Sequence, residues 1–218
     1  MNQRVTSYRL NTDAARQVGQ ASGIDEKGAY IGQFTRAELV VSTKGTQGIE
    51  FDFITLDGRT ARYLSVWTVN KDGQELGGRK LIDAIMTSIG VREIQAADAT
   101  IKKWNTETRS EENTRATVFP ALMGKPIGLV LCREEYMAGD GQLKWKNVMV
   151  CPFEAVTKRT ASERLDNAPA EMLDKIVASL RDRPYREAPR TTGTGHRTNA
   201  SQSSGGSGFD DMDDNIPF

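Results

Sequence analysis

Three segments of the chain place an aromatic ring beside lysine or arginine: RTARYLSVWT, IKKWNTETR and LKWKN. One cation of the first predicted strand and one of the turn after it join them. The candidate residues are Arg36, Lys44, Arg59, Arg62, Tyr63, Trp67, Lys102, Lys103, Trp104, Lys144, Trp145 and Lys146. Rings on which bases stack and cations that meet phosphates are what sequence-independent binding of single strands requires. We therefore predict that these residues bind nucleic acid. The alternatives, rings packed in a core and cations that are ordinary surface charges, stay open at this point.

The pattern favours a binding protein over an enzyme. The only histidine, His196, lies in a segment rich in Gly, Ser and Thr, so a His-based triad is not available. No P-loop spacing occurs. We expect no catalytic residue, no metal and no cofactor. One enzyme alternative stays open, a metal-dependent nuclease that uses carboxylates such as Glu50, Asp52, Asp57, Glu134 and Glu135.

Periodicity predicts five strands and one helix in the body of the chain. Strands are expected over residues 29–41, 49–53, 59–69, 126–136 and 143–153, and a helix over 77–90 that Gly90 ends. A polar stretch over 96–117 separates the helix from the fourth strand. The order β-β-β-α-β-β is that of an OB-fold, a small five-stranded barrel with a helix between strands 3 and 4.

The rest of the chain divides by composition. Residues 1–27 are predicted to form an N-terminal arm, 28–186 the OB-fold domain, 187–208 a flexible Gly/Ser/Thr/Asn linker and 209–218 an acidic tip. The domain is expected to include a C-terminal helix over 167–183, which Asn167 caps and which ends before Pro184.

Strand alternation indicates which way two of the rings point. Tyr63 and Trp67 share one face of their strand with Ser65, and Leu64 and Val66 share the other. If the two aliphatic residues point into the barrel, both rings point outward. The opposite assignment would bury both rings.

Charge and cysteine content indicate the class of partner and the cellular compartment. The formal net charge is zero, but all 29 Lys and Arg lie within residues 1–197, which carry about +4, whereas four aspartates lie beyond them. A basic body suits a polyanionic partner. No segment has the pattern of a signal peptide or the length of a membrane span, and the two cysteines have no metal-binding spacing. We expect a protein of the reducing cytoplasm with no membrane partner.

The sequence GFDDMDDNIPF combines acidic and apolar residues in a way that predicts a protein-interaction segment. Its contributing residues are Asp210, Asp211, Asp213, Asp214, Ile216, Pro217 and Phe218. We expect the phenylalanine to enter an apolar pocket of a partner while its carboxylate meets a Lys or Arg. The proline lowers the entropy lost on binding, and the aspartates speed the encounter with basic patches. A second hypothesis is that, without DNA, this tail occupies the cationic groove of its own chain.

This tip resembles that of the single-stranded DNA-binding proteins of bacteria and their phages, which typically ends Asp-Ile-Pro-Phe; here Asn215 replaces the aspartate. The body resembles the tailed-phage version in the stretches KGTQGIEFDF to DGRTARYL and MGKPIGLVL. The resemblance implies a protein that coats single-stranded DNA and recruits replication, recombination or repair proteins, in the host cytoplasm if phage-encoded. A strand-annealing recombination mediator and an RNA-binding OB protein stay open. The sequence does not decide whether the protein forms a homo-oligomer.

Overall fold

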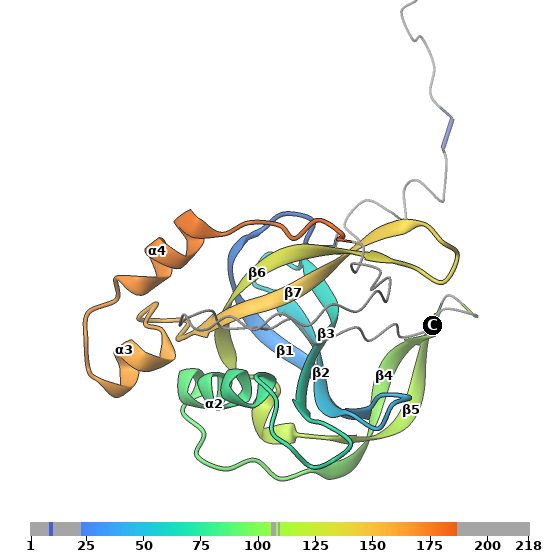
Figure 1. Cartoon of the computed structure of the whole chain (residues 1–218), viewed down its shortest axis with the longest axis horizontal. Coiled ribbons are helices and arrows are strands. Elements are labelled where there is room, and N and C mark those ends of the chain that lie inside the picture. Colours follow the sequence, from blue (N-terminus) through green and yellow to red (C-terminus); the bar gives the residue numbers. More distant parts are fainter. Residues whose placement is uncertain (1–8, 11–22, 106–107, 109, 187–218) are drawn as a thin grey trace, which may run out of the picture.

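The structure is a computed structural model that describes residues 9–10, 23–105, 108 and 110–186, without the side chain of Trp104. The predicted linker and acidic tip, and most of the predicted N-terminal arm, lie outside the described residues. The described chain is mainly β and forms one antiparallel sheet with short helices on its outside (Figure 1).

The first three strands form the predicted meander. They are β1 (Gly28–Val41), β2 (Gln47–Thr55) and β3 (Thr60–Val69). In β2 the alternation is confirmed, because Ile49, Phe51 and Phe53 are buried while the residues between them are not. The rings of Phe34 and Phe51 pack with centroids 4.4 Å apart in the core. The predicted hairpin turn between β2 and β3 is confirmed, with Gly58 at a φ of 85° that a side chain would disfavour.

Strands β6 (Pro126–Met137) and β7 (Leu143–Phe153) extend the sheet on the other side of β1. The antiparallel pairings give the order β3-β2-β1-β6-β7. Within the described residues no hydrogen-bonded ladder joins β3 to β7, although the two strands come close, so the sheet is open there.

At one end of this opening the chain before β1 bridges the two strands. The amide of Ile24 donates to the carbonyl of Thr60 at 2.8 Å, and its carbonyl accepts a hydrogen bond from Nδ2 of Asn147, also at 2.8 Å. The Ile24 side chain is buried in the core. Ile24, which belongs to the predicted N-terminal arm, is thus part of the core. A single extended residue shows no strand period, so nothing in its sequence indicated this contact.

The predicted helix is α2 (Gly78–Ile89), whose apolar stripe packs on the core beside β3 and β7. Gly90 ends it as predicted, at a φ of 73°. The short helix η1 (Pro120–Leu122) follows later in the chain and leads into β6.

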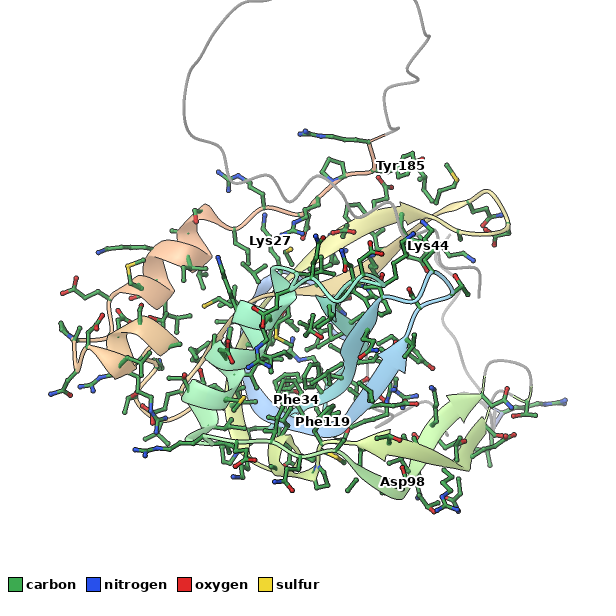
Figure 2. The ribbon with its side chains drawn as sticks, turned by 60° about the horizontal axis from the view of Figure 1, so that its bottom comes forward. Lys27, Phe34, Lys44, Asp98, Phe119 and Tyr185 are labelled. Atoms are coloured by element: carbon green, nitrogen blue, oxygen red, sulfur yellow. The ribbon has the colours of Figure 1, made fainter. Side chains whose placement is uncertain are left out.

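The polar stretch over 96–117 forms two strands that the sequence analysis did not anticipate. Strands β4 (Ala97–Asn105) and β5 (Ser110–Val118) pair with each other along their length, while β5 joins β1 only where Glu38 pairs with Val118. The hairpin therefore projects from the sheet, and Figure 2 shows Asp98 on it, away from Phe34 in the core. Most of β5 is exposed, so no apolar period marks it in the sequence.

The C-terminal helix differs from its prediction. Two helices form, α3 (Ala161–Leu165) and α4 (Met172–Ser179), and Asn167 lies between them at a φ of 50° instead of capping a helix. Helix α4 ends before Pro184 is reached, because the following residues turn extended and Arg183 pairs with β6. Leu173 and Leu180 pack on the outer side of β6 and β7. None of the helices in the described part is long and apolar enough to cross a membrane.

Candidate nucleic-acid interface

The outward side chains of β1, β2 and β3 form a first surface, which we call the meander face: Arg36, Glu38, Glu50, Asp52, Tyr63, Ser65 and Trp67. Leu64 and Val66 are buried, whereas Tyr63 and Trp67 are half-buried, which confirms the outward assignment of the two rings. Gly48 lies across from Trp67, and a Cβ there would come within 2.9 Å of the indole. The glycine thus provides space for the ring on the sheet.

Arg36 is enclosed by carboxylates on this face. Its guanidinium bonds Asp52 at 2.9 Å, Glu50 at 2.8 Å and Glu38, and its side chain is only 2% exposed. Burial alone would lower the pKa of Arg36, but the hydrogen bonds and charges of Asp52 and Glu50 outweigh it and raise that pKa. Removing one partner of such a buried pair costs about 3–5 kcal/mol. We therefore withdraw Arg36 from the predicted phosphate contacts.

The β4–β5 hairpin lies against the meander face through two ion pairs. Nζ of Lys103 is 3.1 Å from Glu38, and Arg62 on β3 is 3.2 Å from Glu111 on β5. Both basic side chains are about one-third exposed. The Arg62–Glu111 pair is accessible to solvent on both sides and contributes little to stability, whereas Glu38 is buried. Arg62, unlike Arg36, can therefore exchange its carboxylate for a phosphate at small cost.

The ends of β6 and β7 reach beyond the core as a two-stranded ribbon and form a second surface, the Trp145 face. It consists of six residues that the strand register places on one side of the ribbon: Arg133, Glu135, Met137, Leu143, Trp145 and Asn147. The indole is 45% exposed, and the guanidinium of Arg133 lies 5.0 Å from its centroid. An exposed indole held by a cation offers a flat platform for a base.

The register separates residues that the sequence analysis had grouped together. Lys144 and Lys146 point to the opposite side of the ribbon from Trp145, where Nζ of Lys146 lies 5.7 Å from the Tyr136 ring. Their carboxylate partners, Asp140 at 2.7 Å and Glu134 at 3.2 Å, are at the surface. The Trp145 side of the ribbon therefore carries one ring and one arginine, and the opposite side carries one ring and two lysines.

Three residues in or beside this ribbon were not among the predicted site residues: Arg133, Tyr136 and Arg183. Arg133 and Tyr136 belong to the strand segment CREEYM. Strand alternation places this cation and this ring on opposite faces, but the two glutamates between them obscured the pattern. Arg183 comes from beyond α4, and its side chain reaches Glu134 at 3.3 Å. Only the parallel contact of residue 183 with β6 places it here. No local sequence signal could have found it.

The other predicted cations lie apart from these two faces. Arg59 is bound to Asp57 at 2.8 Å and stacks over Tyr30 with its guanidinium 5.1 Å from the centroid. Lys44 lies in the turn between β1 and β2, and Lys102 is exposed on β4. The side chain of Trp104 is outside the described residues.

The carboxylates considered for a nuclease have other partners here. Glu50 and Asp52 bind Arg36, and Asp57 binds Arg59. Glu134 binds Lys146 and Arg183, and Glu135 accepts a hydrogen bond from the amide of Tyr185 at 3.1 Å. Within the described ranges, no group of three or more His, Cys, Asp and Glu is placed to hold a metal ion.

Comparison with known proteins does not assign a family. No family model matches the chain, and no curated protein matches it. The inference about function therefore starts from the rings, the cations and their surroundings.

Proposed function

We propose that this protein binds single-stranded DNA without sequence preference and recruits DNA-processing proteins through residues 209–218. The observation that carries the first part is the exposed Trp145 ring with Arg133 beside it, on a ribbon whose other cations have only surface partners. Stacking on an exposed ring is tolerant of base identity because every base has a π-face. The acidic and apolar composition of the tip supports the second part.

The arrangement of strands supports an OB-type body. An OB-fold is a partly open five-stranded barrel that binds oligonucleotides on strands 2 and 3 and on the loops between strands 1 and 2 and between strands 4 and 5. Taking β1, β2, β3, β6 and β7 as these five, the corresponding positions are the meander face, the turn with Lys44 and the tip of the β6–β7 ribbon. The β4–β5 hairpin is then an insertion that lies beside the meander face.

One extended segment links the strands that carry the two ring-bearing faces, at one end of the opening of the sheet. Asn147, two residues from Trp145, bonds Ile24, and Ile24 bonds Thr60, which is two residues from Arg62. A single strand that leaves the meander face near Arg62 therefore reaches the ribbon after crossing one extended segment. We propose that it follows this path, with Arg62, Lys103 and Arg133 meeting phosphates.

The test compares Trp145→Ala with Tyr136→Ala, because these rings lie on opposite sides of the same ribbon. Labelled poly-dT is titrated with the full chain and binding is followed by fluorescence anisotropy at low salt. Loss of one stacked base costs about 1–3 kcal/mol, so we expect Trp145→Ala to weaken binding roughly 5- to 150-fold. Tyr136→Ala should change it by less than about twofold.

Two outcomes would refute the proposal at different levels. If wild type does not bind poly-dT even at low salt, the function itself is wrong. If it binds but Trp145→Ala binds equally well, the Trp145 face is not the base platform. Because stacking does not distinguish sugars, competition with an RNA oligonucleotide of the same sequence decides between DNA and RNA.

A further inference from the structure

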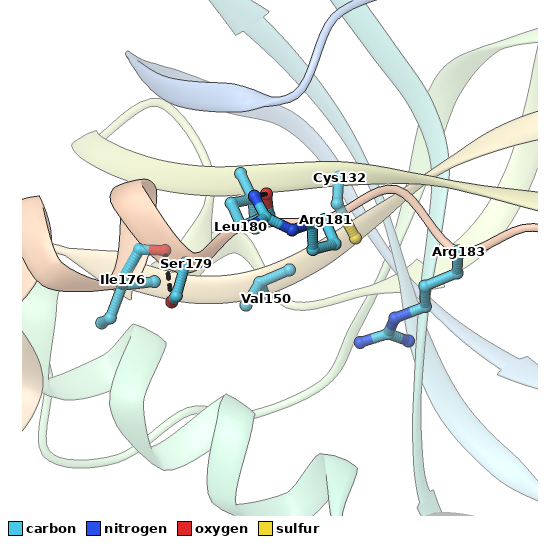
Figure 3. A pocket seen from close by; sticks show the side chains of 7 residues that line it. All are labelled: Cys132, Val150, Ile176, Ser179, Leu180, Arg181 and Arg183. Atoms are coloured by element: carbon cyan, nitrogen blue, oxygen red, sulfur yellow. Dashed lines mark hydrogen bonds between the residues drawn. The ribbon is translucent and has the colours of Figure 1, made fainter.

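A shallow pocket lies between α4 and the outer side of β6 and β7, away from both ring-bearing faces. Its apolar lining comes from Cys132, Val150, Ile176 and Leu180, and two arginines, Arg181 and Arg183, also line it. Figure 3 shows Val150 at its centre, with Arg183 on one side and Ile176 on the other. The pocket thus combines an apolar floor with two positive charges.

The size and charge of this pocket indicate the kind of group that fits. Its volume is about 200 Å³. An aliphatic cavity of roughly 150 Å³ binds benzene, so one phenyl ring fits here. The side chain of Arg183 is 56% exposed and has a surface partner in Glu134 at 3.3 Å, and Arg181 is exposed as well. Both guanidiniums are therefore accessible to a carboxylate that accompanies the ring.

We propose that the acidic tip of the same chain, residues 209–218, docks in this pocket, with the Phe218 ring on the apolar floor and aspartates of the tip at Arg181 and Arg183. The tip supplies the two chemical features that the pocket lacks, a ring and a cluster of carboxylates. The pocket is then a resting site from which partner proteins take the tip. This inference goes beyond the proposed function and does not depend on DNA binding.

The length of the intervening chain favours the tip of the same molecule over that of another. The 32 residues from 187 to 218 follow Arg186 directly, and Arg183 lies only a few residues earlier. The Gly/Ser/Thr-rich composition of this segment predicts a root-mean-square reach of roughly 30 Å for a chain of its length. Linkers of this kind give effective concentrations that approach the millimolar range, well above ordinary protein concentrations.

Photo-crosslinking in the full chain tests the docking. Phe218 is replaced by p-benzoylphenylalanine, the protein is irradiated at micromolar concentration, and cross-linked peptides are identified by mass spectrometry. We expect cross-links to the segments that contain Val150 and residues 176–180, in a product that migrates as a monomer. Arg181→Glu should lower their yield roughly tenfold, because it removes a charge-assisted contact.

The matched control is Lys175→Glu, the same charge reversal on an exposed position of α4 that does not line the pocket. It should leave the yield within about twofold of wild type. Cross-links to the meander face or the Trp145 face, or scattered over the surface, would refute the proposal. An equal effect of the two charge reversals on the cross-linking yield would also refute it. A cross-linked dimer would show that the pocket takes the tip of a second copy of the chain. A negative cross-linking result would not change the result expected from the poly-dT titration, so the docking proposal and the DNA-binding proposal are tested independently.

Discussion

At the scale of single residues, the environment of Arg36 decides what its charge does. Three carboxylates from two strands surround one guanidinium, and Lys103 adds a second cation at Glu38. We expect Arg36→Ala to lower the free energy of unfolding by about 3–5 kcal/mol, because the carboxylates would lose their central partner. The free energy of unfolding of Arg36→Lys should lie between those of wild type and Arg36→Ala, because an ammonium group cannot reach all three carboxylates.

Urea unfolding of the full chain measures this effect. The control is Arg79→Ala, an exposed arginine of α2 paired with Asp83, which should change the free energy by less than about 0.5 kcal/mol. A normal unfolding free energy for Arg36→Ala combined with weaker poly-dT binding would contradict the structural role. It would restore Arg36 as a phosphate contact.

The positions of the rings were partly predictable for a local reason. Alternation places Tyr63 and Trp67 on the side of the strand opposite Leu64 and Val66. Which of the two sides faces the core stayed open in the sequence and is decided by the burial of Leu64 and Val66. The partners of Arg36 were not predictable, because they depend on the register of β1 with β2. Alternation also places Trp145 on the opposite side of its strand from Lys144 and Lys146, but the three residues were predicted to act as one group.

At the scale of elements, Glu163 connects the two C-terminal helices. One carboxylate oxygen accepts from the amide and hydroxyl of Thr160, which precedes α3, at 2.8 Å each. The other accepts from the amides of Glu171 and Met172 at the start of α4, at 2.7 Å each. These hydrogen bonds, that of Thr160 foremost, lower the pKa of Glu163 to about 2.

The lowered pKa gives a prediction about acid stability. A carboxyl group whose pKa is lower in the folded state stabilises the fold above its ordinary value of 4.5, and this contribution is lost as the pH falls toward 2. We expect the melting temperature of Glu163→Gln to be lower than that of wild type at pH 7, with the difference shrinking between pH 4.5 and 2. Asp166→Asn, on the same segment, is the control. A difference that stays constant over this pH range would contradict the assignment.

The β4–β5 hairpin shows why some elements escape sequence analysis. Both of its strands carry polar residues on both sides, and its cross-strand pairs, such as Thr117 with Asp98, are hydrogen bonds at the surface. Strands with one buried side, such as β2, and the amphipathic helix α2 were found because burial imposes an apolar period. Helix α3 has only five residues, too few to show one.

The same hairpin gives a prediction about affinity. Glu111 pairs with Arg62, whereas its neighbour Glu112 bonds Asn105 and Thr108 within the hairpin. Glu111→Gln removes one carboxylate from Arg62, so we expect tighter poly-dT binding at low salt and a salt slope steeper by about 0.7, as for one added phosphate contact. Glu112→Gln removes an equal charge and serves as the control. Identical titrations for the two variants would show that Arg62 does not meet phosphate.

At the scale of the whole molecule, the opening between β3 and β7 determines how the two ring-bearing faces are joined. Helix α2 packs beside both strands, and at the other end Ile24 is held between Thr60 and Asn147. The hydrogen bond from Nδ2 of Asn147 is the direct link between β7 and this segment. If it is lost, the meander and the ribbon should separate at this end while the rest of the sheet stays paired.

Asn147→Asp tests this link with almost no change in shape. The substitution replaces the donating amide by a carboxylate that faces the carbonyl of Ile24, in a half-buried position. We expect the free energy of unfolding to fall by about 1–3 kcal/mol, because neither oxygen would have a donor. Hydrogen exchange at the Ile24 amide should become faster than in wild type, since that amide is protected by its bond to Thr60. Asn113→Asp, the same change at an exposed position of β5, should alter neither quantity. Unchanged exchange at the Ile24 amide in Asn147→Asp would mean that core packing of the Ile24 side chain alone holds the segment. The proposed path of single-stranded DNA between the two faces would then lose its structural support.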